Sequence, residues 1–273
     1  NGKFSINFAT AYKDFLYMGL NLNAHFLNYD KSTQLRESNS NSGVGQNTII
    51  FRDNLSTTGN GFSFQLGAIG KVNDHLRLGA SYESPTWFTI SEQASQSLRT
   101  DGDQFGGSIS VDPNVVNVYP DYTLQTPGKL TGSIALIFGN QGLLSFDYSY
   151  KDYSNTQFRP TGDPSFSSMN ETLSSSLKAT SSYRLGGEYR IENWSLRGGY
   201  RFEESPYKNG NTIGDLDGFS AGLGYDFGNL KLDAAYDSSS RTDNPQLYQT
   251  GLVNSAQIKR DFSSVVISLS FGI

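Results

Sequence analysis

The chain has no cysteine, only two histidines and few charged residues, which make up 17% of its 273 positions. The lack of cysteine excludes disulfide frameworks, thiol catalysis, zinc ribbons and iron–sulfur clusters. The longest uninterrupted apolar run, Ile134 to Phe138, is far shorter than the roughly 20 residues that a membrane-spanning helix needs. A thiol enzyme, a disulfide-rich secreted domain and a helical membrane protein are therefore excluded.

The charge balance also argues against a nucleic-acid partner, because the formal net charge is −5 and lysines and arginines do not cluster. The mean hydropathy is −0.45, yet aromatic residues reach 13% and glycine occurs 29 times. A polar average with many aromatic and glycine residues is typical of a transmembrane β-barrel, since every second residue faces a wet interior.

Apolar and polar residues alternate along the chain in segments of about ten residues. In 219–227 the odd positions are apolar or aromatic, and the even positions are serine, glycine and aspartate. The segment 230–237 repeats the pattern after the turn pair Gly228-Asn229. A period of two predicts strands with one apolar and one polar face.

Extended over the whole chain, this pattern predicts eleven antiparallel strands joined by alternating short and long connections. The strands lie near 3–12, 16–36, 61–72, 76–90, 126–138, 143–158, 178–191, 194–206, 217–227, 230–240 and 257–273. The long polar connections cover roughly 37–60, 91–125, 159–177, 207–216 and 241–256. Short turns on one rim and long loops on the other are typical of outer-membrane barrels.

A soluble β-sandwich is the alternative, but its inward face is apolar and its strands are usually shorter. Here the polar face carries charge on strand after strand, at Arg77, Glu83, Lys129, Asp147, Arg184, Glu188, Arg197, Arg201, Lys231 and Asp233. We therefore predict an all-β fold, an antiparallel transmembrane β-barrel of the bacterial outer membrane. Its expected surroundings are the lipid bilayer and lipopolysaccharide.

Strand parity makes a further prediction. Bacterial single-chain barrels have an even number of strands, because both termini lie on the periplasmic side. The short turn after residue 12 makes the first strand run toward the periplasm, so an odd number of strands should precede it. We expect residues 1–273 to form one barrel domain that lacks its first strands.

Three segments resemble the FadL-type family of outer-membrane transporters: Leu76–Pro85, Thr126–Ser133 and Leu196–Pro206. They occur in the family's order, and the resemblance covers residues 1–273. It implies about 14 strands in the full protein, of which the last eleven are here, and an N-terminal plug that is not in this sequence. It also implies passive transport of hydrophobic small molecules, such as long-chain fatty acids or aromatic hydrocarbons.

The candidate substrate-binding residues are Trp87, Phe88, Arg77, Glu83, Arg197 and Arg201. Trp87 and Phe88 follow Pro85 at the top of a predicted strand, where they form either a landing site for substrate or an ordinary aromatic girdle. The charged residues either orient a substrate carboxylate or pair with one another across strands. The sequence leaves both questions open.

No catalytic residue, metal or cofactor is expected, and we do not expect the protein to be an enzyme. His25 lies on the polar face of the second predicted strand, and His75 lies in a short turn. Asp101-Gly102-Asp103 is interpreted as a loop tip, because no glutamate follows at the far ligand position of a calcium loop. The alternative function is a docking or structural subunit that binds proteins of a larger membrane complex through its long loops.

Overall fold

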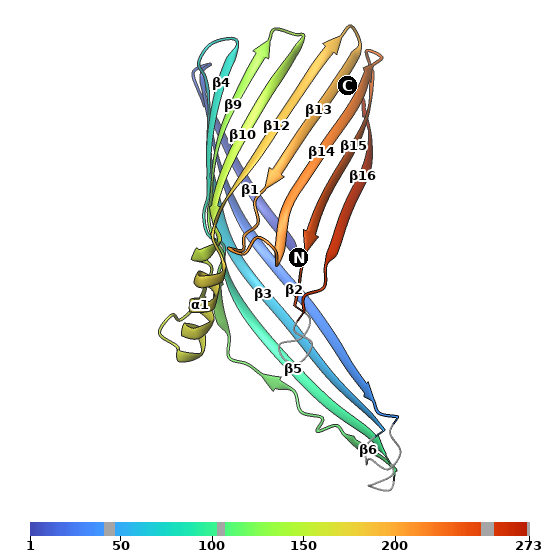
Figure 1. Ribbon diagram of the computed structural model, residues 1–273. Helices are drawn as coiled ribbons and strands as arrows, with labels where there is room; N and C mark the ends of the chain where they lie inside the picture. Colours follow the sequence, from blue (N-terminus) through green and yellow to red (C-terminus); the bar gives the residue numbers. More distant parts are fainter. Residues whose placement is uncertain (41–46, 103–106, 247–253, 272–273) are drawn as a thin grey trace.

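The computed structural model describes residues 1–40, 47–102, 107–246 and 254–271, and one antiparallel sheet of 16 strands dominates it (Figure 1). Eleven long strands form the wall of this sheet. They are β1 (Gly2–Tyr12), β2 (Leu16–Ser38), β3 (Thr48–Lys71), β4 (Leu76–Glu83), β9 (Lys129–Phe138), β10 (Gly142–Asp152), β12 (Ala179–Ile191), β13 (Trp194–Glu203), β14 (Ile213–Asp226), β15 (Leu230–Asp243) and β16 (Ile258–Phe271).

Each wall strand corresponds to one predicted strand and pairs with its neighbour along the chain. The turns at one rim are short; Glu192 and Gly228 take positive φ values of 51° and 95° there, as tight hairpins require. Across the described ranges, no strand pairs with the outer edge of β1 or of β16. The eleven wall strands are confirmed, two of them with bounds that differ from the prediction, and the idea that further strands precede residue 1 stays a prediction.

The alternation gives the wall two chemically different faces. Leu196, Tyr200 and Leu223 lie on the apolar face and are each at least 44% exposed. Among the residues that the structure describes, the buried apolar side chains are those of Ile90, Leu177 and Pro127 alone. The sheet therefore has almost no core of its own, and its apolar face needs an apolar surrounding such as lipid.

The predicted strand 76–90 is wrong, because the chain leaves the wall at Ser84-Pro85-Thr86 and starts a new strand, β5 (Trp87–Gly102). Proline lacks the N–H that a continuous ladder would need. Ser84 closes the gap: its N–H donates to the Phe64 carbonyl, and its Oγ accepts from the Phe64 N–H, both at 2.9 Å. As a result β3 has two successive partners, β4 along 65–71 and β5 along 48–62.

Much of the predicted loops 37–60 and 91–125 is strand instead. Beyond the rim, residues 27–38 of β2, 48–60 of β3 and 89–102 of β5 continue as a three-stranded extension, here called the blade (Figure 1). Its β5 edge pairs with β6 (Gly107–Val111), β7 (Asn117–Val118) and β8 (Tyr122–Gln125). Asp101 and Gly102 end β5, so they are not a loop tip, and Asp103 lies outside the described residues.

The predicted loop 159–177 contains a helix, α1 (Pro164–Ser176). Asp163 caps it by accepting the Ser165 N–H at 2.8 Å, and Pro164 occupies the first helical turn, where its missing N–H costs nothing. In the described part of the chain, no helix is long and apolar enough to cross a membrane.

The predicted strand 143–158 is also interrupted: β10 ends at Asp152, the 3-10 turn η2 (Tyr153–Asn155) follows, and β11 (Gln157–Arg159) pairs with β8. Asn170 of α1 brackets β11, since its amide donates to the Phe158 carbonyl at 2.9 Å and accepts from the Phe158 N–H at 2.7 Å. These two bonds hold α1 against the strand.

Candidate functional site

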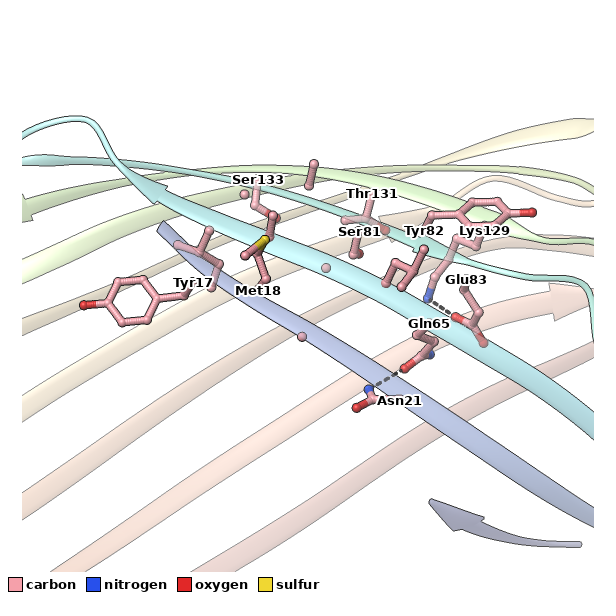
Figure 2. Close-up of a pocket in the computed structure, with 17 residues that line it drawn as sticks. Tyr17, Met18, Asn21, Gln65, Ser81, Tyr82, Glu83, Lys129, Thr131 and Ser133 are labelled. Atoms are coloured by element: carbon pink, nitrogen blue, oxygen red, sulfur yellow. Dashed lines mark hydrogen bonds and ion pairs between the residues drawn. The ribbon is translucent and has the colours of Figure 1, made fainter. Parts of the chain in front are cut away.

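Unbroken register aligns the polar-face residues of the wall into rows that run across neighbouring strands. One row consists of small residues: Gly19, Gly67, Ser81, Thr131 and Ser149. Because these side chains project little, the wall is hollowed there (Figure 2), and the cavity measures about 500 Å³. We call this cavity the hollow.

Several polar groups around the hollow satisfy one another. The Asn21 amide donates to the Gln65 side-chain oxygen at 2.9 Å (Figure 2). The hydroxyls of Thr131 and Ser149 lie 2.8 Å apart. At the end toward the blade, Lys129 Nζ and Glu83 Oε2 form an ion pair at 3.3 Å (Figure 2). The hollow thus has paired polar groups within a largely apolar lining, and the charges of Lys129 and Glu83 offset each other.

Two rows beyond Glu83, where the blade begins, the polar face becomes apolar. We call the side chains that cause this change the rim cluster: Leu27, Phe88, Ile90, Leu124 and Phe158. Glycines seat them, because a Cβ at Gly61 would lie 2.6 Å from the Phe88 ring and a Cβ at Gly59 would lie 2.7 Å from Ile90. Ile90 is only 1% exposed, so this part of the face is well packed.

Helix α1 extends the rim cluster with aromatic rings. The Tyr122 ring lies 5.6 Å from that of Phe158 and 5.5 Å from that of Phe166, and the last two stack at 5.8 Å. Burial, with Glu92 nearby as a charge and hydrogen-bond acceptor, raises the pKa of Tyr122 to about 12. The phenol therefore stays protonated and donates to Glu92, which keeps its polar end out of the aromatic contacts.

A buried polar cluster lies between the rim cluster and the hollow. His25 Nε2 is 2.8 Å from Ser63 Oγ, which also accepts from the Asn23 amide at 3.3 Å. A serine beside a histidine is the arrangement of many hydrolases, but Ser63 is 0% exposed and cannot reach a substrate. The contact is not visible in the sequence, because His25 and Ser63 are 38 residues apart and only the strand register brings them together.

The other half of the wall carries more charge among its small residues. Arg197 bridges two carboxylates, with Nε 2.7 Å from Glu188 and Nη1 2.5 Å from Asp233. Arg201 pairs with Asp237 at 3.0 Å. We call this network on β12–β15 the ion-pair ladder; its members are Arg184, Glu188, Arg190, Arg197, Arg201, Glu203, Asp233 and Asp237.

The two aromatic candidates from the sequence lie on opposite faces. Phe88 is opposite Gly61 and belongs to the rim cluster. Its neighbour Trp87 is opposite Phe62, points to the apolar side and is 38% exposed. Only Phe88 can therefore contact a molecule that moves along the polar face, whereas Trp87 has the position of a girdle residue.

The charged candidates are spread over the wall. Glu83 borders the hollow, and Arg77 lies at the short-turn rim, opposite Lys71 and Ala135. Arg197 and Arg201 lie on β13, separated from β4 by three strands, and both pair with carboxylates across strands. The structure thus brings Glu83 and Phe88 onto one stretch of wall and keeps the two arginines apart from it.

The chain matches the model of a known protein family. Residues 8–271 match the model of the family described as "Outer membrane protein transport protein (OMPP1/FadL/TodX)", and the chain belongs to this family. No curated protein matches the sequence.

Solved structures with a similar fold include the "CymD monoaromatic hydrocarbon channel", with 17% identity, a TM-score of 0.57, and 96% of this chain and 72% of that chain covered. A FadL homologue of Pseudomonas aeruginosa has 16% identity, a TM-score of 0.65, and 98% and 66% coverage. The toluene transporter TodX of Pseudomonas putida has 15% identity, a TM-score of 0.57, and 98% and 68% coverage. At these identities the likeness shows the fold.

Family membership confirms the predicted class: an outer-membrane β-barrel with a transport role and no enzymatic one. The apolar face of the wall is accordingly the lipid-facing surface, the polar face lines the lumen, and the blade stands on the exterior side. The chain spans between 66% and 72% of the three solved chains. Binding of lipopolysaccharide and of other membrane proteins stays a prediction.

Proposed function

We propose that the protein is a passive outer-membrane route for uncharged hydrophobic small molecules, with monoaromatic hydrocarbons as its main substrates. The observation that carries this proposal is that the rim cluster lies on the same stretch of lumen wall as the hollow, two rows beyond Glu83 at the edge of the hollow. Two of the similar solved structures are described as a monoaromatic hydrocarbon channel and a toluene transporter, which supports the same class of substrate.

The rim cluster supplies the first contact. An apolar molecule gains about 25 cal/mol for each Å² of apolar surface that it removes from water. Phe88, Leu124 and Phe158 offer such surface where the exterior blade meets the lumen. Because Gly59 and Gly61 seat the neighbouring side chains, the cluster is in place before a substrate arrives.

The hollow supplies the next binding position for the substrate. Its volume of about 500 Å³ lies within the range of roughly 300–1,000 Å³ that is typical of small-molecule sites. Asn21 is already hydrogen-bonded to Gln65 and Thr131 to Ser149, so an apolar guest does not leave these groups without partners. Polar groups that were not paired in this way would oppose the passage of a hydrocarbon.

The charge of the hollow favours hydrocarbons over fatty acids. The lysine that lines it, Lys129, is paired with Glu83 at 3.3 Å. A substrate carboxylate would have to displace Glu83 from this lysine, whereas an uncharged ring would leave the pair intact. The long-chain fatty acids implied by the resemblance are therefore the second substrate class.

The opposite orientation of two adjacent aromatic residues provides the test. Phe88→Ala and Trp87→Ala would be made in the full-length protein, and uptake of radiolabelled toluene would be measured in cells that lack another route. We expect Phe88→Ala to lower uptake at limiting toluene by roughly tenfold, the effect of losing one buried ring. Trp87→Ala, which removes an aromatic ring from the lipid-facing side, should stay near wild type.

Equal uptake by the two variants would contradict the proposal. If the protein also co-purified with a stoichiometric partner in both cases, the docking function would stand instead. Competition with unlabelled palmitate separates the two substrate classes, because a hydrocarbon route should be inhibited less by palmitate than by unlabelled xylene.

A further inference from the structure

The blade has two chemically different faces. The register of β2 with β3 is continuous from Leu16 opposite Gly70 to Ser38 opposite Thr48, so each face of the wall continues into the blade. On the face that continues the lumen, one row consists of Leu35, Phe51, Leu98 and Val111. The face that continues the lipid-facing surface, here called the outward face, carries arginines at the same height.

Three arginines gather on the outward face. Arg36 of β2 and Arg99 of β5 flank Ile50 in one row, and Arg52 of β3 lies in the adjacent row. Because neighbouring strands are about 4.8 Å apart, the three guanidinium groups share an area roughly 10 Å across. Arg52 Nε is fixed by the Gln34 side-chain oxygen at 3.0 Å.

This cluster is open to solvent and carries excess positive charge. The Arg99 side chain is 57% exposed, and Arg36 and Arg52 are exposed as well. Among the described residues, the carboxylate beside the cluster is that of Asp101, 3.3 Å from Arg99. Within this described part, three guanidinium groups against one carboxylate leave a positive patch on a protein whose net charge is −5.

Between the lipid-facing wall and the arginines, the outward face presents mainly amides and hydroxyls. These residues are Asn28, Ser32, Asn54, Ser56, Thr58, Ser91, Gln93 and Ser95, with Asp30 among them. Some are ordered by hydrogen bonds of their own: Ser32 Oγ donates to Asn54 at 2.7 Å, and the Asn54 amide donates to Ser95 at 3.4 Å. Amides and hydroxyls in extended rows match the donors and acceptors of a sugar chain.

We propose that the outward face of the blade binds the phosphorylated core oligosaccharide of the surrounding lipopolysaccharide, with Arg36, Arg52 and Arg99 as the anion-binding residues. Guanidinium groups bind phosphate with two parallel hydrogen bonds, which gives geometric selectivity as well as attraction. The amide and hydroxyl rows contact the sugars, and the blade stands on the side of the membrane where this glycan lies. The surface is separate from the lumen and does not depend on the proposed substrate.

The test uses the full-length protein in detergent micelles and three probes: phosphorylated core oligosaccharide released from lipid A, the same oligosaccharide after dephosphorylation, and inorganic phosphate. Binding is measured by isothermal titration calorimetry. We expect the triple variant R36Q/R52Q/R99Q to bind the phosphorylated oligosaccharide roughly tenfold or more weakly. The triple Arg→Lys variant should lie in between, because lysine keeps the charge but loses the planar fork.

Lys31→Gln is the matched control, since Lys31 lies on the other face of the same strand and should not affect glycan binding. Resistance of each variant to unfolding in SDS at room temperature shows that it is folded. Equal binding of the dephosphorylated oligosaccharide, or unchanged binding by the triple glutamine variant, would overturn the proposal. So would inorganic phosphate that binds as tightly as the glycan, because the site would then recognise a bare anion.

Discussion

The two halves of the lumen wall use the same strand pattern but different chemistry on their polar faces. Around β2, β3, β4 and β9, small neutral residues line most of the hollow, whereas on β12–β15 the ion-pair ladder lines a cavity of similar size, about 480 Å³. An apolar molecule against the ladder would remove water from charged pairs, which is costly even when they stay paired. The comparison teaches that strand alternation fixes the barrel, while the size and charge of the polar-face residues decide which part of the wall an apolar substrate can follow.

The largest expected effect tests what the two halves share, namely a common lipid-facing side. Leu223 lies on that side of β14, and Ser220 faces the lumen on the same strand. Leu223→Arg should lower the free energy of unfolding by about 2–4 kcal/mol if it lies near the bilayer midplane, because it moves a charge into lipid. Ser220→Arg should cost much less. Urea unfolding in liposomes measures both, and equal costs would contradict the assignment of faces.

The second prediction breaks the ladder. Arg197→Met leaves Glu188 and Asp233 without their shared partner, and the exposed fractions of these two side chains are only 14% and 23%. We expect a loss of about 1–3 kcal/mol in the free energy of unfolding, less than for a fully buried pair because the lumen is wet. Toluene uptake should change little. A large drop in uptake by folded protein would show that the ladder half belongs to the substrate route.

The third prediction disturbs the seat of the rim cluster. A Cβ at Gly61 would lie 2.6 Å from the Phe88 ring, so Gly61→Ala has to displace that ring. The expected cost is about 1–2 kcal/mol in stability from overpacking, with reduced toluene uptake. Gly70→Ala, on the same strand with no atom within 4 Å of its Cβ, is the control. Similar effects of the two variants would rule out a specific role for the seat.

The smallest expected effect lies in the hollow. Lys129→Met removes an ion pair whose side chains are 42% and 33% exposed, so stability should change by less than about 1 kcal/mol. Because an uncharged substrate does not need this lysine, toluene uptake should persist. Loss of uptake in the folded variant would favour a carboxylate substrate. The hollow half of the wall would then also act through its charge.

The sequence predicts the wall well because alternation is local. Each wall strand, and the face on which Arg197 or Leu223 lies, can be deduced from a period of two alone. The break at Ser84-Pro85 and the cap at Asp163-Pro164 are also visible in the sequence. The prediction nevertheless ran one strand, 76–90, through Pro85 and placed a plain loop, 159–177, around Asp163; there tertiary pairing with β3 and packing against β11 decide the structure.

The candidate site was less predictable, because rows across strands depend on register and therefore on every turn between the strands. Gly19, Gly67 and Ser81 form one row, although dozens of residues separate Gly19 from the other two in the sequence. Parity could have shown that Trp87 and Phe88 face opposite ways. Which of the two faces the lumen follows only from the pairing of Phe88 with Gly61.

The double partnership of β3 has a consequence for how the molecule can vary. Since β4 ends where β5 begins, the blade and the wall share β2 and β3, and only the strand on the other edge of β3 differs: β4 in the wall and β5 in the blade. One residue added to β2 and one to β3 at the far end of their hairpin would lengthen the blade and leave every pair in the membrane unchanged. A single residue inserted in the blade portion of β3 alone would exchange the arginine and apolar faces beyond it, unless a bulge absorbed it. The reach of the exterior surface is therefore adjustable in matched pairs of residues, and the barrel does not have to be rebuilt when that reach changes.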